Sequence, residues 1–216
     1  MSFYKEIQIQ CANPNAYYPW YSPKDMDIAE MVAQFSVLTS FQLRKLGCSS
    51  NVLSRLVKHG ILHRYKVKTP NSSLPSIFTT GPTAGKLAKL PVPRFTNMEV
   101  LRSLLIVNQV IIHIFLESNA NVDVNPRRPI QIITVNKPTG VMYTRSLNYT
   151  EIPLRYNLTQ AIIIVPNKSY IYSGLPFRYV LEDELQQSQI RFYYCSGENI
   201  LPVNINFNKK ENAAVV

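Results

Sequence analysis

The spacing of apolar and polar residues between Thr39 and Thr80 predicts two short helices. Thr39 and Gln42 have the spacing of a capping box, in which a threonine hydroxyl accepts the amide three residues on and the glutamine reaches back. The helix that begins there carries apolar residues as far as Leu46. It is expected to end at Gly47, because glycine tolerates the left-handed conformation that ends many helices.

The second helix is predicted to begin after Ser49, its N-cap, and to end near Lys58. Its apolar residues are spaced so that they share one helical face. These residues are Val52, Leu53, Leu56 and Val57. His59-Gly60 follows and is expected to stop the helix, so a tight turn alone separates the two helices.

A β-hairpin is predicted directly after the second helix. Residues 61–68 and 76–80 are rich in β-forming side chains, and the stretch 69–75 between them is rich in turn residues. Helix, tight turn, helix and hairpin follow one another in the order of a winged helix-turn-helix. The second helix of such a domain enters the DNA major groove, which makes 49–58 the predicted recognition helix.

Three further helices are expected around this region. Residues 25–35 predict a first helix with acids in its first turn, where they suit the helix dipole, and residues 83–90 predict a short basic helix. A long helix is predicted from Thr96 to about Ser118. From Val107 onward it is apolar nearly all round, so it is either a central packing helix or a dimer interface.

After the long helix the pattern changes to that of strands. Six short β-rich segments are separated by Asn, Pro, Gly and Lys turns, and a short helix is expected at 182–189. The segments are 130–135, 141–144, 161–165, 170–172, 177–181 and 190–194. The predicted fold class is therefore α+β, a winged helix-turn-helix followed by a mixed α/β domain with one sheet.

The chain is predicted to have four parts. Residues 1–24 form an aromatic N-terminal arm, with a short strand at Glu6–Gln10 and closely spaced prolines that exclude a helix. This arm is expected to pack on a neighbouring domain or a second subunit, with base stacking as the alternative. The winged domain is expected at 25–93, the long helix with the sheet at 94–203, and a flexible tail at 204–216.

Charge distinguishes the predicted winged domain from the rest of the sequence. The 216 residues carry a formal net charge of +10 at pH 7. Between Leu38 and Arg94 there are ten basic residues and no Asp or Glu. A polyanionic partner explains such one-sided charge, because each phosphate that is neutralised releases counterions. Double-stranded DNA is therefore the first expected partner, although an acidic protein would also satisfy the charge.

The predicted recognition helix and hairpin supply the candidate DNA contacts. Arg55 and Asn51 are expected to read bases, while the lysines and Arg64 are expected to bind backbone phosphates. The full set is Ser50, Asn51, Ser54, Arg55, Lys58, Arg64, Lys66 and Lys68. A homodimer is expected, because winged-helix proteins commonly read paired half-sites, and the long apolar helix and the aromatic arm are the candidate interfaces.

Other chemistry has little support in the sequence. The three cysteines are far apart and none lies in a C-x-x-C pair, which argues against a disulfide framework or a zinc site, and Cys48 is expected to be a small buried apolar residue. His113 is expected to be a hydrogen-bonded core residue. His59 and His63 are separated by a helix end and need not share a face, so they are not expected to bind a metal. No cofactor is expected either.

No apolar run approaches the roughly 18 residues that span a bilayer, and the N-terminus does not begin like a signal peptide. A cytoplasmic protein with no membrane partner is therefore expected.

The order of these elements resembles that of the replication-relaxation family of Gram-positive plasmids, phages and integrative elements. The winged helix, the strand–Thr/Gly–helix segment 77–87, the long helix and the late sheet carry the likeness, which covers roughly residues 28–195. It implies a DNA-binding regulator or accessory protein of a mobile genetic element, acting in replication, transfer or transcription.

In that family the late sheet is similar to a restriction-endonuclease-like core, whose active members hold a divalent metal with an acid on one strand and a Glu-x-Lys on the next. Here residues 157–160 contain no carboxylate, and Glu182–Glu184 has no lysine two positions on. A degenerate core without enzymatic activity is therefore expected, with a metal-dependent nuclease as the third hypothesis. The first hypothesis is the DNA-binding protein described above. The second hypothesis is an adaptor that binds and modulates a host replication or transcription factor.

Overall fold

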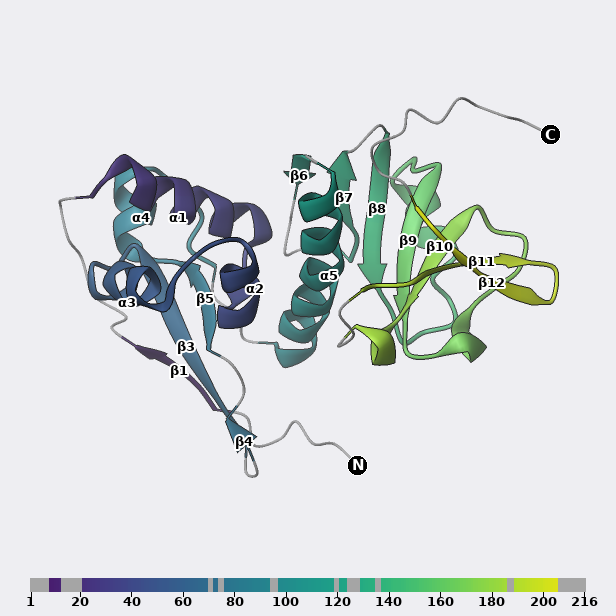
Figure 1. Cartoon of the computed structure of the whole chain (residues 1–216), viewed down its shortest axis with the longest axis horizontal. Helices are drawn as coiled ribbons and strands as arrows, with labels where there is room; N and C mark the ends of the chain where they lie inside the picture. The colour runs from purple at the N-terminus through teal and green to yellow at the C-terminus, as the bar shows by residue number, and fades with distance from the viewer. Residues whose placement is uncertain are drawn as a thin grey trace. The chain divides into compact units, whose positions relative to one another are not determined.

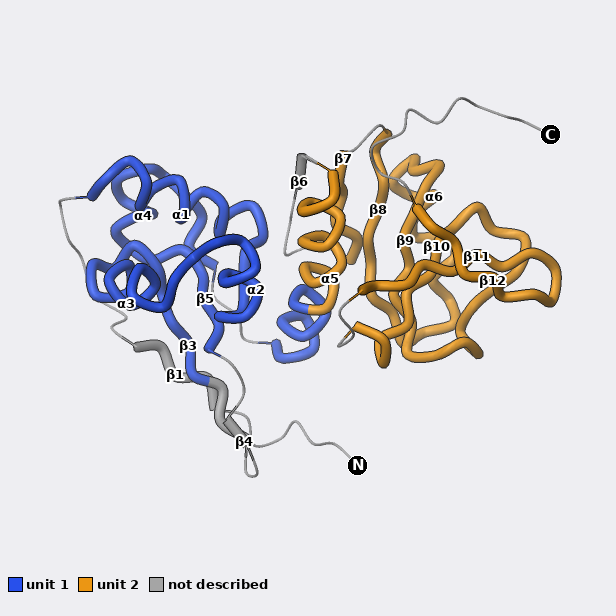
Figure 2. The backbone as a smooth tube through the Cα atoms, viewed as in Figure 1, with its two compact units in different colours: residues 1–105 blue, residues 106–216 orange. Residues whose placement is uncertain are grey.

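In the computed structural model, residues 1–105 and 106–216 form two compact units, so the boundary falls inside the longest helix (Figure 2). The structure describes residues 8–12, 21–69, 72–73, 76–93, 97–118, 121–123, 129–134, 137–185 and 189–205. Each unit combines helices with a sheet of its own (Figure 1). The predicted α+β class is therefore confirmed.

Local sequence signals set the helices of unit 1. These are α1 (Pro23–Phe35), α2 (Ser40–Lys45), α3 (Ser50–Lys58), α4 (Pro82–Leu87) and the first part of α5 (Met98–Glu117). The capping box before α2 is confirmed, since the Thr39 hydroxyl accepts the Gln42 amide at 3.1 Å and the Gln42 side chain accepts the Thr39 amide at 2.9 Å. Ser49 caps α3 as predicted, and Gly47 and Gly60 follow the two helices with φ angles of 89° and 66°.

Helix α1 begins two residues before its predicted start. The Ser22 hydroxyl accepts the amide of Asp25 at 3.2 Å and so acts as the N-cap. Pro23 occupies the first helical turn, where a missing amide hydrogen costs nothing. The expectation that the prolines of 1–24 exclude a helix is therefore wrong at Pro23.

The sheet of unit 1 is antiparallel throughout. Its strands are β1 (Gln8–Ala12), β2 (Leu38–Thr39), β3 (Leu62–Thr69), β4 (Ser72–Ser73) and β5 (Ile77–Thr80). The order is β1-β3-β5-β2, and β4 pairs with the far end of β3. The predicted hairpin is confirmed: β3 pairs with β5 from Leu62 to Tyr65 and then continues past it beside β1 (Figure 1).

The segment between β5 and α4 is bound tightly to the end of α3. The amide of Gly81 donates to the carbonyl of Ile61 at 2.7 Å, and the amide of Thr83 donates to the carbonyl of Gly60 at 2.9 Å. The Thr83 hydroxyl donates to the carbonyl of His59 at 2.7 Å. A Cβ at Gly81 would lie 2.3 Å from the Gly60 oxygen, so glycine is the residue that lets the two chains approach this closely.

The sheet of unit 2 is mixed, with three parallel strands at its centre. Its order is β12-β11-β10-β9-β8-β7-β6, and only the β8–β9 and β9–β10 pairs are parallel. The strands are β6 (Asn121–Asp123), β7 (Gln131–Thr134), β8 (Pro138–Tyr143), β9 (Gln160–Val165), β10 (Phe177–Leu181), β11 (Phe192–Ser196) and β12 (Asn199–Val203). Ala161 to Val165 of β9 are all buried, which explains the unbroken apolar run of this central strand.

Several elements of unit 2 differ from the prediction. Residues 170–172 are not a strand, because Lys168–Tyr170 forms a single 3₁₀ turn capped by Asn167. The helix expected at 182–189 is a 3₁₀ turn, Glu182–Glu184, with residues 186–188 outside the described part. β6, β12 and the short helix α6 (Glu151–Arg155) were not predicted. The tail beyond residue 205 and most of the N-terminal arm also lie outside the described residues.

Helix α5 is as apolar as its sequence indicates. By length and composition it is the one helix in the described ranges that could cross a membrane, but a core helix meets the same criterion. Val110, Ile111, Ile112 and Ile114 are at most 1% exposed, whereas Leu116 is 55% exposed. The helix therefore buries most of its apolar surface within the protein and leaves its last turn accessible.

Candidate nucleic-acid interface

The side of α3 that faces away from the core carries the residues predicted to contact DNA. Leu53, Leu56 and Val57 are buried on the opposite side. The exposed residues are Ser50, Asn51, Ser54, Arg55 and Lys58. They are linked by spacings of three or four positions, so they are neighbours on one helical face. We call these five residues the α3 face.

One acidic residue from outside the predicted basic region reaches this face. Nη2 of Arg55 donates a hydrogen bond to Oδ1 of Asp25 in α1, where the two side chains are 50% and 6% exposed. Part of the charge of Arg55 is therefore compensated within unit 1. This contact could not be predicted from the sequence, because its partners are 30 residues apart and no local pattern connects them.

The hairpin contributes cations of unequal accessibility. Lys66 is exposed on β3, whereas Arg64 is only partly exposed and its buried Nε has no hydrogen-bond partner in the described structure. The side chain of Lys68 lies outside the described part, although its backbone pairs with Ser73 and Gln8. Of the three hairpin cations predicted to bind phosphate, the structure thus presents Lys66 most openly and Arg64 less so.

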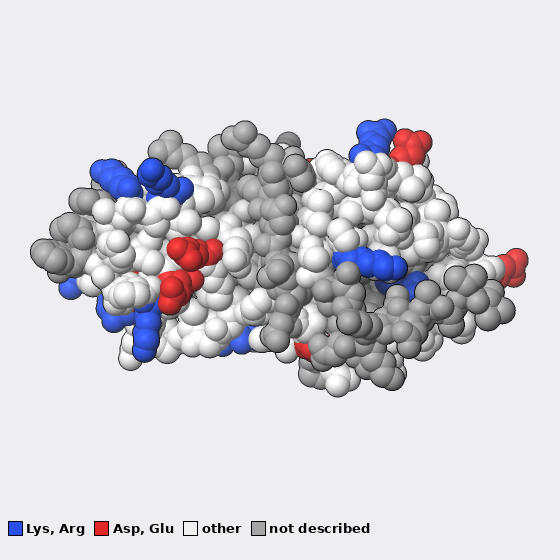
Figure 3. Space-filling view, turned by 90° about the horizontal axis from the view of Figure 1, so that it is seen from above, with Lys and Arg blue, Asp and Glu red and all other residues white. Residues whose placement is uncertain are grey.

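In the described part of unit 1, helices α2 and α3 and strand β3 carry basic side chains and no acidic ones. Apart from the half-buried Arg64, the cations of α2, α3 and β3 whose side chains are described are exposed; they are Arg44, Lys45, Arg55, Lys58 and Lys66. The acids in the described part of unit 1 are Asp25, Asp27 and Glu30 of α1, and Glu99 of α5. Figure 3 looks onto the side of unit 1 where α1 lies and shows acidic side chains there with Lys or Arg side chains around them. The cations on α2, α3 and β3 thus have no acidic neighbour on their own elements, which favours a polyanionic partner at these elements.

Cys48, in the turn between α2 and α3, is a free thiol that is 6% exposed. Burial raises the pKa of Cys48, so its thiol is a poor nucleophile. The expectation of a small buried apolar residue is confirmed.

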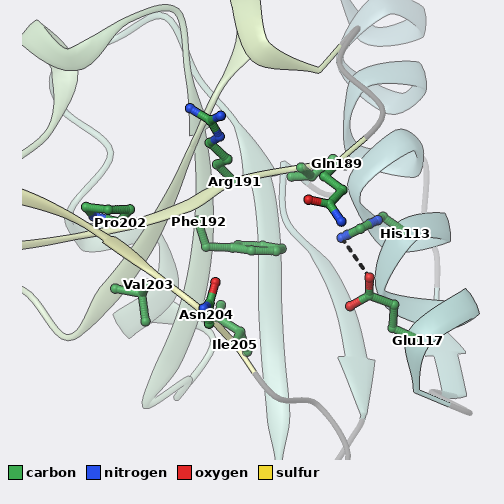
Figure 4. A pocket seen from close by; sticks show the side chains of 10 residues that line it. His113, Glu117, Gln189, Arg191, Phe192, Pro202, Val203, Asn204 and Ile205 are labelled. Atoms are coloured by element: carbon green, nitrogen blue, oxygen red, sulfur yellow. Dashed lines mark ion pairs between the residues drawn. The ribbon is translucent and has the colours of Figure 1, made fainter.

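A cavity of about 660 Å³ lies in unit 2 beside the second half of α5 (Figure 4). His113 and Glu117 line it from α5, with Nε2 and Oε1 3.4 Å apart, and Gln189 and Asn204 add amide groups. The His113 ring also stacks on Phe192 with centroids 6.2 Å apart. His113 is 20% exposed and faces this cavity, so its description as a core residue is only partly right. Phe192 is 4% exposed and offers a ligand little aromatic surface.

The acids after β10 are engaged with tyrosines. The Tyr143 hydroxyl donates to Glu182 at 2.6 Å, and the Tyr193 hydroxyl donates to Glu184 at 2.8 and 2.9 Å. Burial, and then the hydrogen bond to Glu184, raises the pKa of Tyr193. Within the described ranges, no three His, Cys, Asp or Glu side chains come together as a metal site. Glu182 and Glu184 are thus each engaged with a tyrosine hydroxyl.

The chain matches no known family model, no curated protein and no solved structure. Its function is therefore inferred from the residues and geometry described above.

Proposed function

We propose that unit 1 is a winged helix-turn-helix domain that binds double-stranded DNA, with α3 as its recognition helix and the β3–β5 hairpin as its wing. The observation that carries this proposal is the α3 face, which is polar, exposed and free of acidic residues of its own. Hydroxyl, amide, guanidinium and ammonium groups are those that contact base edges and phosphates.

The order of elements supports the same proposal. Helix α1, strand β2, helices α2 and α3, and strands β3 and β5 follow one another along the chain, and β2, β5 and β3 form one antiparallel sheet. This order of elements is the one expected of a winged helix-turn-helix, and it supports the proposal. The bonds from Gly81 and Thr83 to the end of α3 would hold the recognition helix in a fixed position against the hairpin.

The residues divide into two roles. Asn51, Arg55 and the neighbouring serines would contact base edges in the major groove. Lys58 at the end of α3 and Lys66 on the wing would bind phosphates on either side of the groove, with Arg64 and Lys68 as further wing contacts. Because phosphate contacts release counterions, binding to any duplex would weaken steeply as salt is raised.

The wider role follows from the resemblance in layout. We infer a cytoplasmic DNA-binding regulator or accessory protein of a mobile genetic element, acting in replication, transfer or transcription as a homodimer. The exposed last turn of α5, with Leu116 at 55% and Phe115 at 37%, is a candidate surface for pairing two copies.

The proposal is tested by fluorescence anisotropy of the whole protein with random-sequence duplexes over a series of salt concentrations. Wild-type protein should bind at low salt with a steep negative salt slope, and Lys66→Ala should make that slope shallower by about one unit. Lys137→Ala, which removes an exposed charge from unit 2, is the matched control and should leave the slope as it is. Absence of duplex binding at low salt would contradict the proposal.

An adaptor that modulates a host replication or transcription factor is the second candidate. Phe41 on α2 favours it, because this ring is 49% exposed and Lys45 lies over it with Nζ 4.9 Å from the centroid. Exposed aromatic and basic groups side by side suit an acidic protein surface as well. An adaptor would show no duplex binding in the anisotropy series, and its capture of an acidic host protein would be lost in Phe41→Ala.

A further inference from the structure

We infer that Asp25 is a positioning residue that holds the Arg55 guanidinium ready to read a guanine in the major groove. This inference rests on the proposed function, since it requires α3 to lie in the groove. It adds an acidic residue from α1 to a site that otherwise consists of α3 and the wing, and it names the base that the site selects.

The Asp25 carboxylate is fixed on both of its oxygens. Oδ2 accepts the backbone amide of Ser22 at 3.4 Å, and Oδ1 accepts Nη2 of Arg55. The amide of Asp25 in turn donates to the Ser22 hydroxyl at 3.2 Å, which completes a capping box at the start of α1. With Asp25 only 4% exposed, the carboxylate is placed to support the arginine and has no free oxygen turned toward a ligand.

Arg55 keeps most of its donors available in this arrangement. A guanidinium carries five N–H donors in a planar fork, and the bond to Asp25 uses one of the two nitrogens at its end. The side chain remains 50% exposed. A fork held along one edge can present another edge to O6 and N7 of guanine, which is the pairing that arginine makes most often with bases.

The position of Arg55 on α3 agrees with this role. Asn51 lies one turn before it and Lys58 nearly one turn after it, so Arg55 is central on the α3 face. An arginine free in solvent loses side-chain entropy when it binds, and a side chain already held by a buried carboxylate loses less. A restrained guanidinium also tolerates fewer alternative bases, which turns a general cation into a selective contact.

The test is selection from a randomised duplex library by wild-type protein and variants, followed by affinity measurements on the selected sequence. Wild-type protein should select guanine at one position of its site. Arg55→Lys keeps the charge but loses the fork, so it should bind random duplexes with similar affinity and lose at least about fivefold in preference for guanine. Asp25→Asn should weaken that same preference, and Asp25→Asn combined with Arg55→Lys should be no worse than Arg55→Lys alone.

Chemical substitution in the DNA gives a readout that does not depend on protein folding. Replacing the selected guanine by 7-deazaguanine removes the N7 acceptor, so wild-type affinity should fall at least about fivefold while Arg55→Lys affinity changes little. Lys58→Ala serves as a comparison, because losing a phosphate contact should weaken all duplexes evenly and leave the guanine preference intact.

Two outcomes separate this inference from the proposed function. If wild-type protein binds no duplex, the proposed function fails and the role of Asp25 fails with it. If it binds duplexes but either Arg55→Lys or a folded Asp25→Asn keeps the guanine preference and the 7-deazaguanine effect of wild type, the winged-helix proposal stands and the positioning role is overturned. Thermal unfolding of each variant shows whether Asp25→Asn still folds. If it does not, Asp25→Glu, which keeps a carboxylate but shifts it by one methylene, is measured in its place and is expected to weaken the guanine preference in the same way.

Discussion

The two units of this protein have similar sizes but distribute their charges differently. Residues 1–105 carry thirteen Lys and Arg against five Asp and Glu, whereas residues 106–216 carry ten against eight. Two acids of unit 2 are used inside the fold, since Glu182 and Glu184 accept hydrogen bonds from Tyr143 and Tyr193. Unit 2 is thus nearly neutral, and most of the net positive charge of the protein belongs to unit 1. This excess favours a polyanionic partner for unit 1.

Charge reversal is the strongest test of whether duplex binding depends on the cations of unit 1 more than on those of unit 2. Lys58→Glu combined with Lys66→Glu should lower duplex affinity by more than about hundredfold, because two phosphate contacts become repulsive. Lys137→Glu combined with Lys168→Glu makes the same change in charge on exposed residues of unit 2 and should lower it far less. Anisotropy at one salt concentration measures both. Equal losses would mean that net charge alone, and no particular surface, governs binding.

The close contact between Gly81 and the backbone of Gly60, just after α3, is expected to tolerate substitution poorly. Gly81→Ala brings a Cβ to 2.3 Å from the Gly60 carbonyl oxygen, which is backbone and has little freedom to move. The free energy of unfolding should fall by about 2 kcal/mol, and duplex binding should weaken as α3 shifts. Urea unfolding followed by circular dichroism measures the first effect.

The control lies in unit 2. Gly174→Ala introduces a side chain at φ 77° with no atom within 4 Å, so it should cost only about 1 kcal/mol from backbone strain and leave duplex binding unchanged. Equal destabilisation by the two substitutions would show that the close approach at Gly81 is unimportant.

The tyrosine–carboxylate contacts of unit 2 can be tested one at a time. Tyr143→Phe removes the hydroxyl that donates to Glu182 and accepts from Arg145, and should lower the free energy of unfolding by about 1 kcal/mol without changing DNA affinity. Tyr21→Phe, on a side chain that is 47% exposed in unit 1, should have no measurable effect on unfolding. A loss of DNA affinity in Tyr143→Phe would assign this cluster a role in binding.

The smallest expected effect is on the pH dependence of stability. Because the pKa of Tyr193 is raised above its ordinary value of 10.0, the folded protein keeps this proton at pH values where the unfolded chain has released it. The stabilisation is complete below about pH 10 and is lost as the pH rises toward the folded-state pKa. Urea unfolding between pH 9 and pH 11 should show a shallower decline in Tyr193→Phe than in wild type. An identical decline would contradict the assignment.

Much of unit 1 could be predicted from the sequence because its signals are local. The box of Thr39 and Gln42, the Ser49 cap, and the glycines after α2 and α3 act within four residues of chain, so their effect is the same whatever surrounds them. The hairpin is also local, since its strands are adjacent in sequence. Unit 2 was predicted less well: residues 170–172 look like a strand, but Asn167 caps a turn there, and β12 was missed because its pattern is weak.

The sequence by itself determined the elements of unit 1, the basic character of residues 38–94 and the polar composition of the α3 face. Only the tertiary structure decided which acid meets Arg55, how far Arg64 is buried, and that Glu182 and Glu184 bind tyrosines. The reason is physical: capping and helical periodicity join residues within a turn of one another, whereas an ion pair across 30 residues or a hydrogen bond across 39 depends on how separate elements pack.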